Sequence, residues 1–322
     1  MTEKRAKELI TNIIEDKDNG AAAVGKATLS ECIYLVASIL PKCMNEADKM
    51  GKDTDASYFA QMIDRYRPFV VDKLKKAGKL WVVYCEATGY PYSIDKEILV
   101  LFDHANHNHI LDSLKRAGYA VTLLEEDPEV FMHEIGHMYR NGFKAIRLTD
   151  GRCEALTLER EEIYGHELFY NDDYITNPAF QEAMISFFQE FRKYDEYEIN
   201  GPVVQKREEK MIRELINAEF MVPCIKTETE EEVEISHPYI DMSQRIESED
   251  GKPVIAIPAF TDGYELEKCY EGKSETMLYS FKELTDLIKE LGANGIVFNF
   301  LGISYYMEKA VAKRIVKDKE LR

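Results

Sequence analysis

The segment HEIGH at positions 133–137 has the residue types and spacing of a zinc-binding helix. Two histidines four residues apart lie on one face of a helix, where both imidazoles can bind the same Zn²⁺ ion. A glutamate between them can act as general base on a zinc-bound water. Read alone, the segment predicts a zinc-dependent metallopeptidase with His133 and His137 as ligands and Glu134 as base.

A catalytic zinc site of this kind needs a third protein ligand, and the local spacing does not supply one. In the metzincin pattern a glycine and a third histidine would occupy the positions of Arg140 and Phe143. A glutamate further along the chain could serve instead, but an acidic chain offers many of them. The candidates are Glu154, Glu159, Glu161 and Glu167.

A second group of histidines lies at His104, His107 and His109, next to Asp103. Imidazole and carboxylate are suitable ligands for zinc and other transition metals. However, the group lies where a strand should give way to a helix, and Asp103 or Asn106 can cap that helix. Because the spacing fixes no ligand geometry, we expect a capped helix start with the imidazoles in solvent.

Composition narrows the class of protein. A chain of 322 residues predicts about two domains. With 59 acidic and 41 basic residues the net charge is −18, which argues against nucleic acid as a general partner. The longest apolar run, 33–40, is too short for a membrane span, and no signal-peptide pattern follows Met1. We therefore expect a cytoplasmic protein whose six scattered cysteines are buried, reduced thiols.

The first 65 residues predict helices. Apolar positions recur at helical spacing over 6–14 and 29–44, and Thr28 is a suitable N-cap for the second stretch. A third helix is expected from Ala56 to Tyr66, ahead of Pro68. From there the chain alternates β-type runs with amphipathic helices. The expected strands are 80–85, 97–102, 120–124 and 143–148; the expected helices are 107–117 and the one that carries the histidine pair, which ends at Gly142.

The same order recurs later in the chain, in strands over 219–224, 253–262, 276–279 and 295–300. We interpret this as a diverged tandem repeat of 66–151 and 205–303. The counterpart of the histidine helix is 281–291, which ends at Gly292 and contains no histidine. We therefore expect the helix at 133–137 to bury Phe131, Ile135, Met138 and Tyr139, with the motif side chains towards solvent or an interdomain groove.

These patterns predict an α+β fold with two similar modules of short mixed sheets covered by helices. The expected domains are an N-terminal helical segment 1–65, a first module 66–151, a helical connector 152–204 and a second module 205–322. The connector is clearest over 180–191, and the second module ends in a basic helix over 305–322.

The second module resembles the N-terminal domain of the SseB family (enhanced serine sensitivity protein B). The residues that carry the resemblance are ELINA at 214–218, FMVP at 220–223, GKPVIAIPAFTD at 251–262 and LGANGIVFN at 291–299. The first module fits the same outline more loosely. The resemblance implies an α+β domain of bacterial origin without established catalytic residues. The chain departs from the family pattern at Phe300, where a proline is usual, and in the acidic segment 227–234.

We therefore expect a non-catalytic, cytoplasmic, SseB-like bacterial protein that binds a partner protein or has a regulatory role, without a cofactor and without nucleic acid or membrane as partner. The alternative is the zinc-dependent metallopeptidase with His133, Glu134 and His137. The acidic segment 227–234 has two interpretations, a docking tip for a basic partner or a solvated loop between strands, and the second is favoured.

Overall fold

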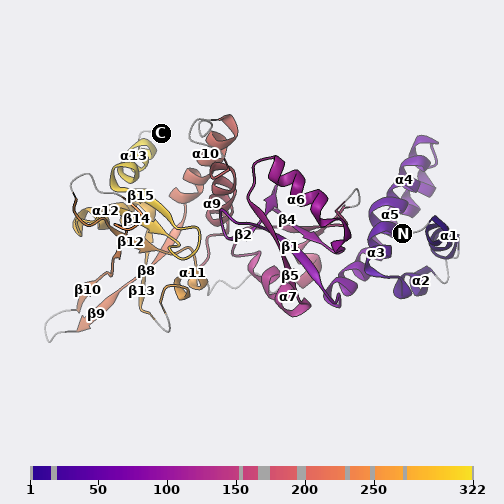
Figure 1. Ribbon diagram of the computed structural model, residues 1–322, viewed down its shortest axis with the longest axis horizontal. Helices are drawn as coiled ribbons and strands as arrows, with labels where there is room; N and C mark the ends of the chain where they lie inside the picture. The colour runs from indigo at the N-terminus through magenta and orange to yellow at the C-terminus, as the bar shows by residue number, and fades with distance from the viewer. Residues whose placement is uncertain are drawn as a thin grey trace. The chain divides into compact units, whose positions relative to one another are not determined.

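The computed structural model describes residues 3–15, 20–151, 155–165, 175–193, 201–228, 233–246, 251–270 and 274–320 (Figure 1). The chain forms two compact units. Unit 1 comprises Met1–Glu86, Pro91–Met138 and Phe143–Phe169, and unit 2 comprises Ala87–Tyr90, Tyr139–Gly142 and Tyr170–Arg322. Helices and short mixed sheets occur in both, so the predicted α+β class is confirmed.

Unit 1 begins with helices, as expected. Thr28 caps the third of them: its hydroxyl accepts the Glu31 amide at 3.2 Å, and the Glu31 carboxylate accepts the Thr28 amide at 2.9 Å. The helices are α1 (Glu3–Ile10), α2 (Gly20–Lys26), α3 (Leu29–Tyr34), α4 (Leu40–Lys49) and α5 (Asp53–Lys75), with the π-helical turns η1 (Thr11–Glu15) and η2 (Leu35–Ile39).

The expected end of a helix ahead of Pro68 is wrong, because α5 continues through the proline to Lys75. Beyond Pro68 the helix buries Val70 and Leu74 in the core of unit 1. An internal proline costs about 3 kcal/mol, whereas burying each of these side chains contributes roughly 1.5–3 kcal/mol. Burial of the continued apolar stripe therefore outweighs the lost hydrogen bond. The expected domain boundary at residue 65 falls within this helix.

The sheet of unit 1 has the strand order β5-β1-β4-β6-β7. Of these strands, β4 and β6 pair in parallel, and the other neighbours pair antiparallel. The strands are β1 (Leu80–Cys85), β4 (Glu97–Leu101), β5 (Val121–Glu126), β6 (Ala145–Thr149) and β7 (Ala155–Glu159), with the short β2 (Tyr90–Pro91) and β3 (Ser93–Ile94). The helices are α6 (His107–Arg116), α7 (Pro128–His137) and α8 (Arg160–Tyr164), preceded by the 3-10 turn η3 (His104–Asn106).

Unit 2 has a four-stranded sheet in the order β11-β12-β14-β15 and a two-stranded sheet, β13-β8. A bridge between Met221 and Phe260 joins β8 to β12, and β12 pairs in parallel with β14. The strands are β8 (Glu219–Pro223), β9 (Ile225–Glu228), β10 (Val233–Ser236), β11 (Ile240–Asp241), β12 (Ile255–Ala259), β13 (Thr276–Ser280), β14 (Gly295–Phe298) and β15 (Tyr305–Glu308). The helices are α9 (Pro178–Phe191), α10 (Pro202–Ile216), α11 (Gly263–Glu267), α12 (Phe281–Glu290) and α13 (Lys309–Glu320).

Helix α9, which the sequence placed in a connector, is buried in the core of unit 2. Its Phe180 ring lies 5.5 Å from Phe220 of β8 and 5.7 Å from Phe298 of β14, between ring centroids. The rings meet edge to face, the arrangement that aromatic quadrupoles favour. Even Gln181 and Glu182 are buried on this helix. The aromatic contacts therefore make α9 an internal support for the sheet.

In each unit an unpredicted strand follows the second strand of the parallel pair. After β6 the chain adds β7, and after β14 it adds β15, both antiparallel to the parallel pair. The prediction that the terminal helix begins at 305 is wrong, because 305–308 is β15 and α13 begins at Lys309. The register of β15 buries Met307 in the core. Because the strand has only four residues, it is too short for its hydrophobic periodicity to reveal this burial.

Two expectations from composition can be compared with the fold. Among the described helices, none has both the length and the hydropathy to cross a lipid bilayer. The described cysteines are free thiols, and Cys32, Cys85 and Cys224 are buried. Burial raises the pKa of the Cys32 thiol to about 11. This thiol is therefore protonated and unreactive at neutral pH.

Gly142 follows α7 and Gly292 follows α12, and both glycines have positive φ (+72° and +69°). A Cβ on Gly142 would collide with the Pro178 carbonyl and lie 2.6 Å from Cβ of Glu182, whereas a Cβ on Gly292 meets nothing within 4 Å. Gly292→Ala should therefore cost only the left-handed backbone, about 1–2 kcal/mol. Gly142→Ala should cost roughly 1–3 kcal/mol more from overpacking. Urea unfolding of both variants measures the difference, and equal costs would contradict the packing at Gly142.

Candidate functional site

Helix α7 presents the histidine pair as the sequence motif requires. The Nε2 atoms of His133 and His137 lie 3.4 Å apart, and the ring centroids lie 4.4 Å apart with planes at 70°. His133 is exposed and His137 is half-buried. The opposite face buries Phe131 and Ile135, as predicted. The Nε2 atoms of the two imidazoles therefore lie next to each other on one face of the helix.

Among the described residues, no third protein ligand for a metal accompanies this pair. Within the described ranges, no three His, Cys, Asp or Glu side chains gather in a metal-binding arrangement. Of the glutamates proposed from sequence, Glu159 is in the capping box of α8, and Glu161 accepts the Arg160 guanidinium at 2.8 Å. Glu154 and Glu167 lie outside the described residues, as does the side chain of Glu134.

The second histidine group adopts the expected capped helix start. The Asp103 carboxylate accepts the amide of Ala105 at 2.8 Å. The rings of His104 and His107 stack at 3.9 Å between centroids, and Nδ1 of His107 lies 2.7 Å from the His104 carbonyl oxygen. His109 lines a shallow surface hollow with Asp112, Lys115 and Arg116. Stacking holds the first two rings parallel instead of directing their nitrogens at a shared ion.

A buried polar cluster in unit 2 was not predicted from the sequence. One oxygen of Glu265, Oε1, accepts the Tyr90 hydroxyl at 2.8 Å, the Arg140 guanidinium at 2.9 Å and the Lys268 ammonium at 2.8 Å. The same Arg140 nitrogen lies 3.5 Å from Oδ2 of Asp262. The Asp262 and Glu265 residues are 2% and 1% exposed. Two acidic and two basic groups thus balance one another inside the unit.

Neutral side chains extend this cluster to the ends of the parallel strands. After β14, the Asn299 side chain accepts the Thr261 amide at 3.0 Å and donates to the Thr261 hydroxyl at 2.9 Å. It also donates to Gln181 of α9 at 2.9 Å. The carboxyl ends of parallel strands are common ligand sites in open sheets. In unit 2 this end is filled by the protein's own side chains.

Burial and charge act in opposite directions on the cluster. Burial raises the pKa of Asp262 above its ordinary value, although the Arg140 guanidinium beside it lowers it. Burial alone would lower the pKa of Arg140, but Asp262 and Glu265 outweigh this and raise it. Burial and the adjacent Glu265 carboxylate raise the pKa of the Tyr90 hydroxyl. The two carboxylates thus favour the charged form of Arg140, whereas burial favours the protonated form of Asp262.

One sequence signal could have located part of this cluster. Asp262 is the N-cap of α11, and its carboxylate accepts the amide of Glu265 three residues later at 3.0 Å. Asp followed three residues later by Glu is a helix-start pattern. Nothing local could connect this pair with Tyr90, which lies 175 residues away in the chain.

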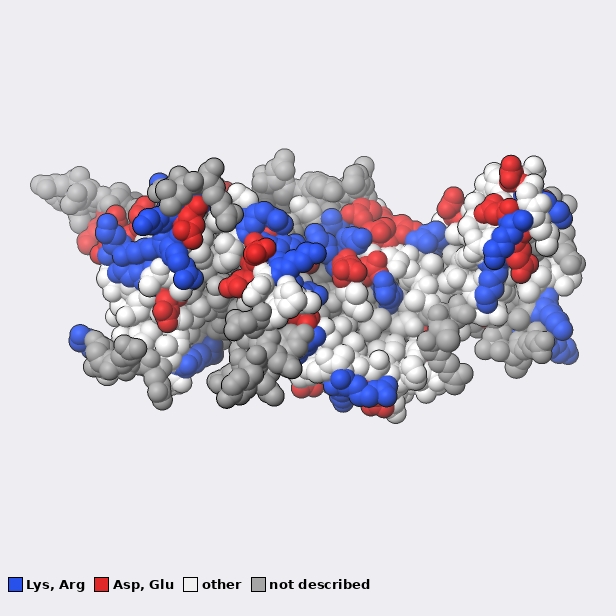
Figure 2. Space-filling model, turned by 90° about the horizontal axis from the view of Figure 1, so that it is seen from above, with Lys and Arg blue, Asp and Glu red and all other residues white. Residues whose placement is uncertain are grey.

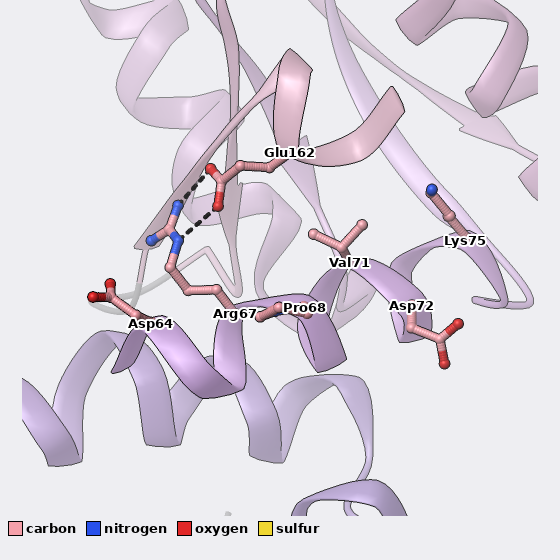
Figure 3. Close-up of a pocket in the computed structure, with 7 residues that line it drawn as sticks. All are labelled: Asp64, Arg67, Pro68, Val71, Asp72, Lys75 and Glu162. Carbon is pink, nitrogen blue, oxygen red and sulfur yellow. Dashed lines mark hydrogen bonds and ion pairs between the residues drawn. The ribbon is translucent and has the colours of Figure 1, made fainter. Parts of the chain in front are cut away.

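A surface groove in unit 1 lies between α5 and α8. It is lined by Asp64, Arg67, Pro68, Val71, Asp72, Lys75 and Glu162 (Figure 3). The Arg67 guanidinium binds both Glu162 oxygens, at 2.8 and 2.7 Å, and also donates to the Thr157 carbonyl at 2.7 Å. This bidentate ion pair joins α5 to α8. The guanidinium of Arg67 therefore has a structural role in the groove.

The strands β9 and β10 form a two-stranded ribbon that projects from unit 2 in Figure 1. Ile225 and Ile235 are 59% and 43% exposed in this β9–β10 ribbon. In the antiparallel register Ile225 pairs with Ser236 and Ile235 with Lys226, so the isoleucines lie on opposite faces. Each face of the ribbon therefore exposes a large apolar side chain.

The base of the ribbon is held by His237. Its Nδ1 lies 2.9 Å from the Pro223 carbonyl oxygen and its Nε2 lies 2.9 Å from the Tyr279 hydroxyl. The adjoining strand β13 exposes Leu278, which pairs with Met221 of β8. The described part of the acidic segment 227–234 belongs to the two strands, and residues 229–232 lie outside the described residues. On the face drawn in Figure 2, by contrast, acidic and basic side chains are interspersed and single out no binding area.

Comparison with known proteins supports the family resemblance of unit 2. Residues 201–309 match the family model of the SseB protein N-terminal domain, and this match covers a third of the chain. It contains the buried residues Thr261, Asp262 and Asn299 as well as the β9–β10 ribbon. No curated protein and no solved structure matches the chain.

The raised pKa of Asp262 predicts a pH dependence. Because the folded state favours the protonated carboxyl, this contribution to stability is complete below the ordinary pKa of 3.8 and is lost as pH rises through the higher folded value. Asp262→Asn keeps an N-cap acceptor and does not titrate. The free energy of unfolding of the wild type, minus that of Asp262→Asn, should therefore fall as pH rises from the ordinary pKa of 3.8 towards neutrality. Urea unfolding measures it; a difference that stays constant over this range would contradict the assignment.

Proposed function

We propose that this protein is a non-catalytic, SseB-like protein of the bacterial cytoplasm that binds a partner protein through the β9–β10 ribbon. The match of residues 201–309 to the SseB protein N-terminal domain supports the SseB-like part of the proposal. The observation that carries the proposal is the exposure of Ile225 and Ile235 on a ribbon that no other described strand covers.

Physical reasoning favours a partner for this ribbon. An isolated two-stranded ribbon is marginally stable in water, and exposed apolar side chains contribute nothing to it. A partner that covers one face would bury an isoleucine. Within the described part of the chain, β9 and β10 pair only with each other, so each has an open edge. Open edges allow another extended segment to add as a strand.

The charge of the segment indicates which chemistry the partner should have. Five glutamates lie within 227–234, in an already acidic chain. Opposite charge speeds encounter and fixes orientation between partners. The occupant that fits best is therefore an extended, basic segment of another protein that also has an apolar side chain. A partner of this kind would give the chain a regulatory or scaffolding role.

The alternative function, a zinc-dependent metallopeptidase, has one observation in its favour, the proximity of His133 and His137. The mechanism also requires a third ligand and a placed general base. The described residues bring no third ligand to the pair. The buried carboxylates of unit 2 do not serve either, since they are held in ion pairs. The binding role is therefore preferred.

In-cell photo-crosslinking tests the proposal. A benzoylphenylalanine at Ile235 should form adducts with a protein partner, whereas the same probe at Val203, 49% exposed on α10, serves as the control position. Reversing Glu228 and Glu234 to Lys should lower adduct formation at Ile235 about tenfold, because attraction of the basic partner is lost.

The partner identified in this way provides a second readout. A synthetic peptide of its basic segment should bind the wild type, with affinity that falls as salt is raised. The charge-reversed variant should unfold at the same urea concentration as the wild type. Equal adducts from Ile235 and Val203, or adducts unaffected by charge reversal, would overturn the proposal.

A further inference from the structure

The histidine pair on α7 has a use that does not require a peptidase. The Nε2 atoms of His133 and His137 are 3.4 Å apart. Two nitrogens bound at about 2.0–2.1 Å to one tetrahedral Zn²⁺ lie about 3.3–3.4 Å from each other. The metal-free imidazoles thus already have the separation that a shared ion would impose.

We infer that His133 and His137 form a binding site for a divalent transition metal ion, Zn²⁺ in the first instance, held by both Nε2 atoms and completed by water. Imidazole is a preferred ligand for this class of metal. Both side chains are accessible, since His133 is exposed and His137 is half-buried. The two imidazoles are the protein ligands of the site, and water takes the remaining positions around the ion.

Packing behind the pair holds the ligands in place. The opposite face of α7 is anchored by Phe131, Ile135 and Met138, all buried. The Tyr164 hydroxyl donates to the carbonyl of Met132, which fixes the turn that carries the first histidine. Because the helix is ordered without the ion, binding has little backbone entropy to offset.

The electrostatics of α7 also favour a cation at this point. His137 is in the last turn of the helix, where unpaired carbonyl groups create partial negative charge. Glu129 is exposed one turn before His133 and on the same face. The helix end and the carboxylate both lower the energy of a bound divalent ion.

The pair at His104 and His107 provides a matched control within the same unit. Its rings stack at 26°, and Nδ1 of His107 is engaged with a carbonyl oxygen at 2.7 Å. These rings cannot place two nitrogens on one ion without leaving their present contacts. Two histidine pairs of similar composition should therefore differ in metal binding.

The test is calorimetric titration of Zn²⁺ into the metal-free full chain. The wild type should show one site. His133→Ala and His137→Ala should each lower the affinity for Zn²⁺ at least about tenfold. Loss of a hydrogen-bond partner behind a metal ligand already has an effect of this size, and loss of the ligand itself should have no smaller one. His104→Ala and His107→Ala should leave the affinity unchanged. Unchanged affinity in both α7 variants, or equal loss in the controls, would overturn the inference.

A second measurement guards against a folding effect. Thermal unfolding with and without Zn²⁺ should show a stabilised wild type, because an ion that binds only the folded state shifts the equilibrium. His137→Gln, which keeps a polar side chain of similar size, should unfold at the same temperature as the metal-free wild type and should gain no stabilisation from Zn²⁺. If His137→Gln is stabilised as much as the wild type, the ion binds elsewhere.

Discussion

The buried carboxylates of Asp262 and Glu265 impose the constraint on which unit 2 depends. A charge removed from water costs several kcal/mol unless an opposite charge and hydrogen bonds compensate it. Arg140 lies within 3.5 Å of both carboxylates, with Tyr264 stacked on its guanidinium at 4.1 Å. Meeting this requirement fixes three things together: the start of α11, the end of β12 and the segment Tyr139–Gly142.

The same constraint determines where function can reside. In many sheets the carboxyl ends of parallel strands receive a ligand. Here Thr261, Asn299 and Gln181 bond to one another in that place, and the carboxylates are paired. In the described part of unit 2 the ends of the parallel strands are thus occupied by the protein's own side chains, whereas the β9–β10 ribbon of this unit and His133 of unit 1 are exposed.

Much of the fold could be predicted because the spacing of apolar residues along the sequence indicates which face of a helix or strand is buried. The strand at 80–85 and the packing face of α7 were predicted from spacing alone, and the SseB resemblance was confirmed over 201–309. The errors occur where tertiary contacts override local signals. Pro68 is kept inside α5 by the buried stripe around it, and 305–308 becomes a strand because it pairs with β14. The Tyr90–Glu265 contact joins positions 175 residues apart, which no window along the chain can reveal.

The claim that the buried charges are structural can be tested most directly by a double-mutant cycle in the free energy of unfolding. Arg140→Leu and Glu265→Leu should each cost about 3–5 kcal/mol, because the first leaves the buried Asp262 carboxylate without its guanidinium and the second leaves Arg140 with the longer, 3.5 Å contact to Asp262. The double variant should lose less than the sum of the two, with a coupling of about 1–3 kcal/mol. Losses that add to within about 0.5 kcal/mol would contradict the account and return these carboxylates to the list of candidate functional groups.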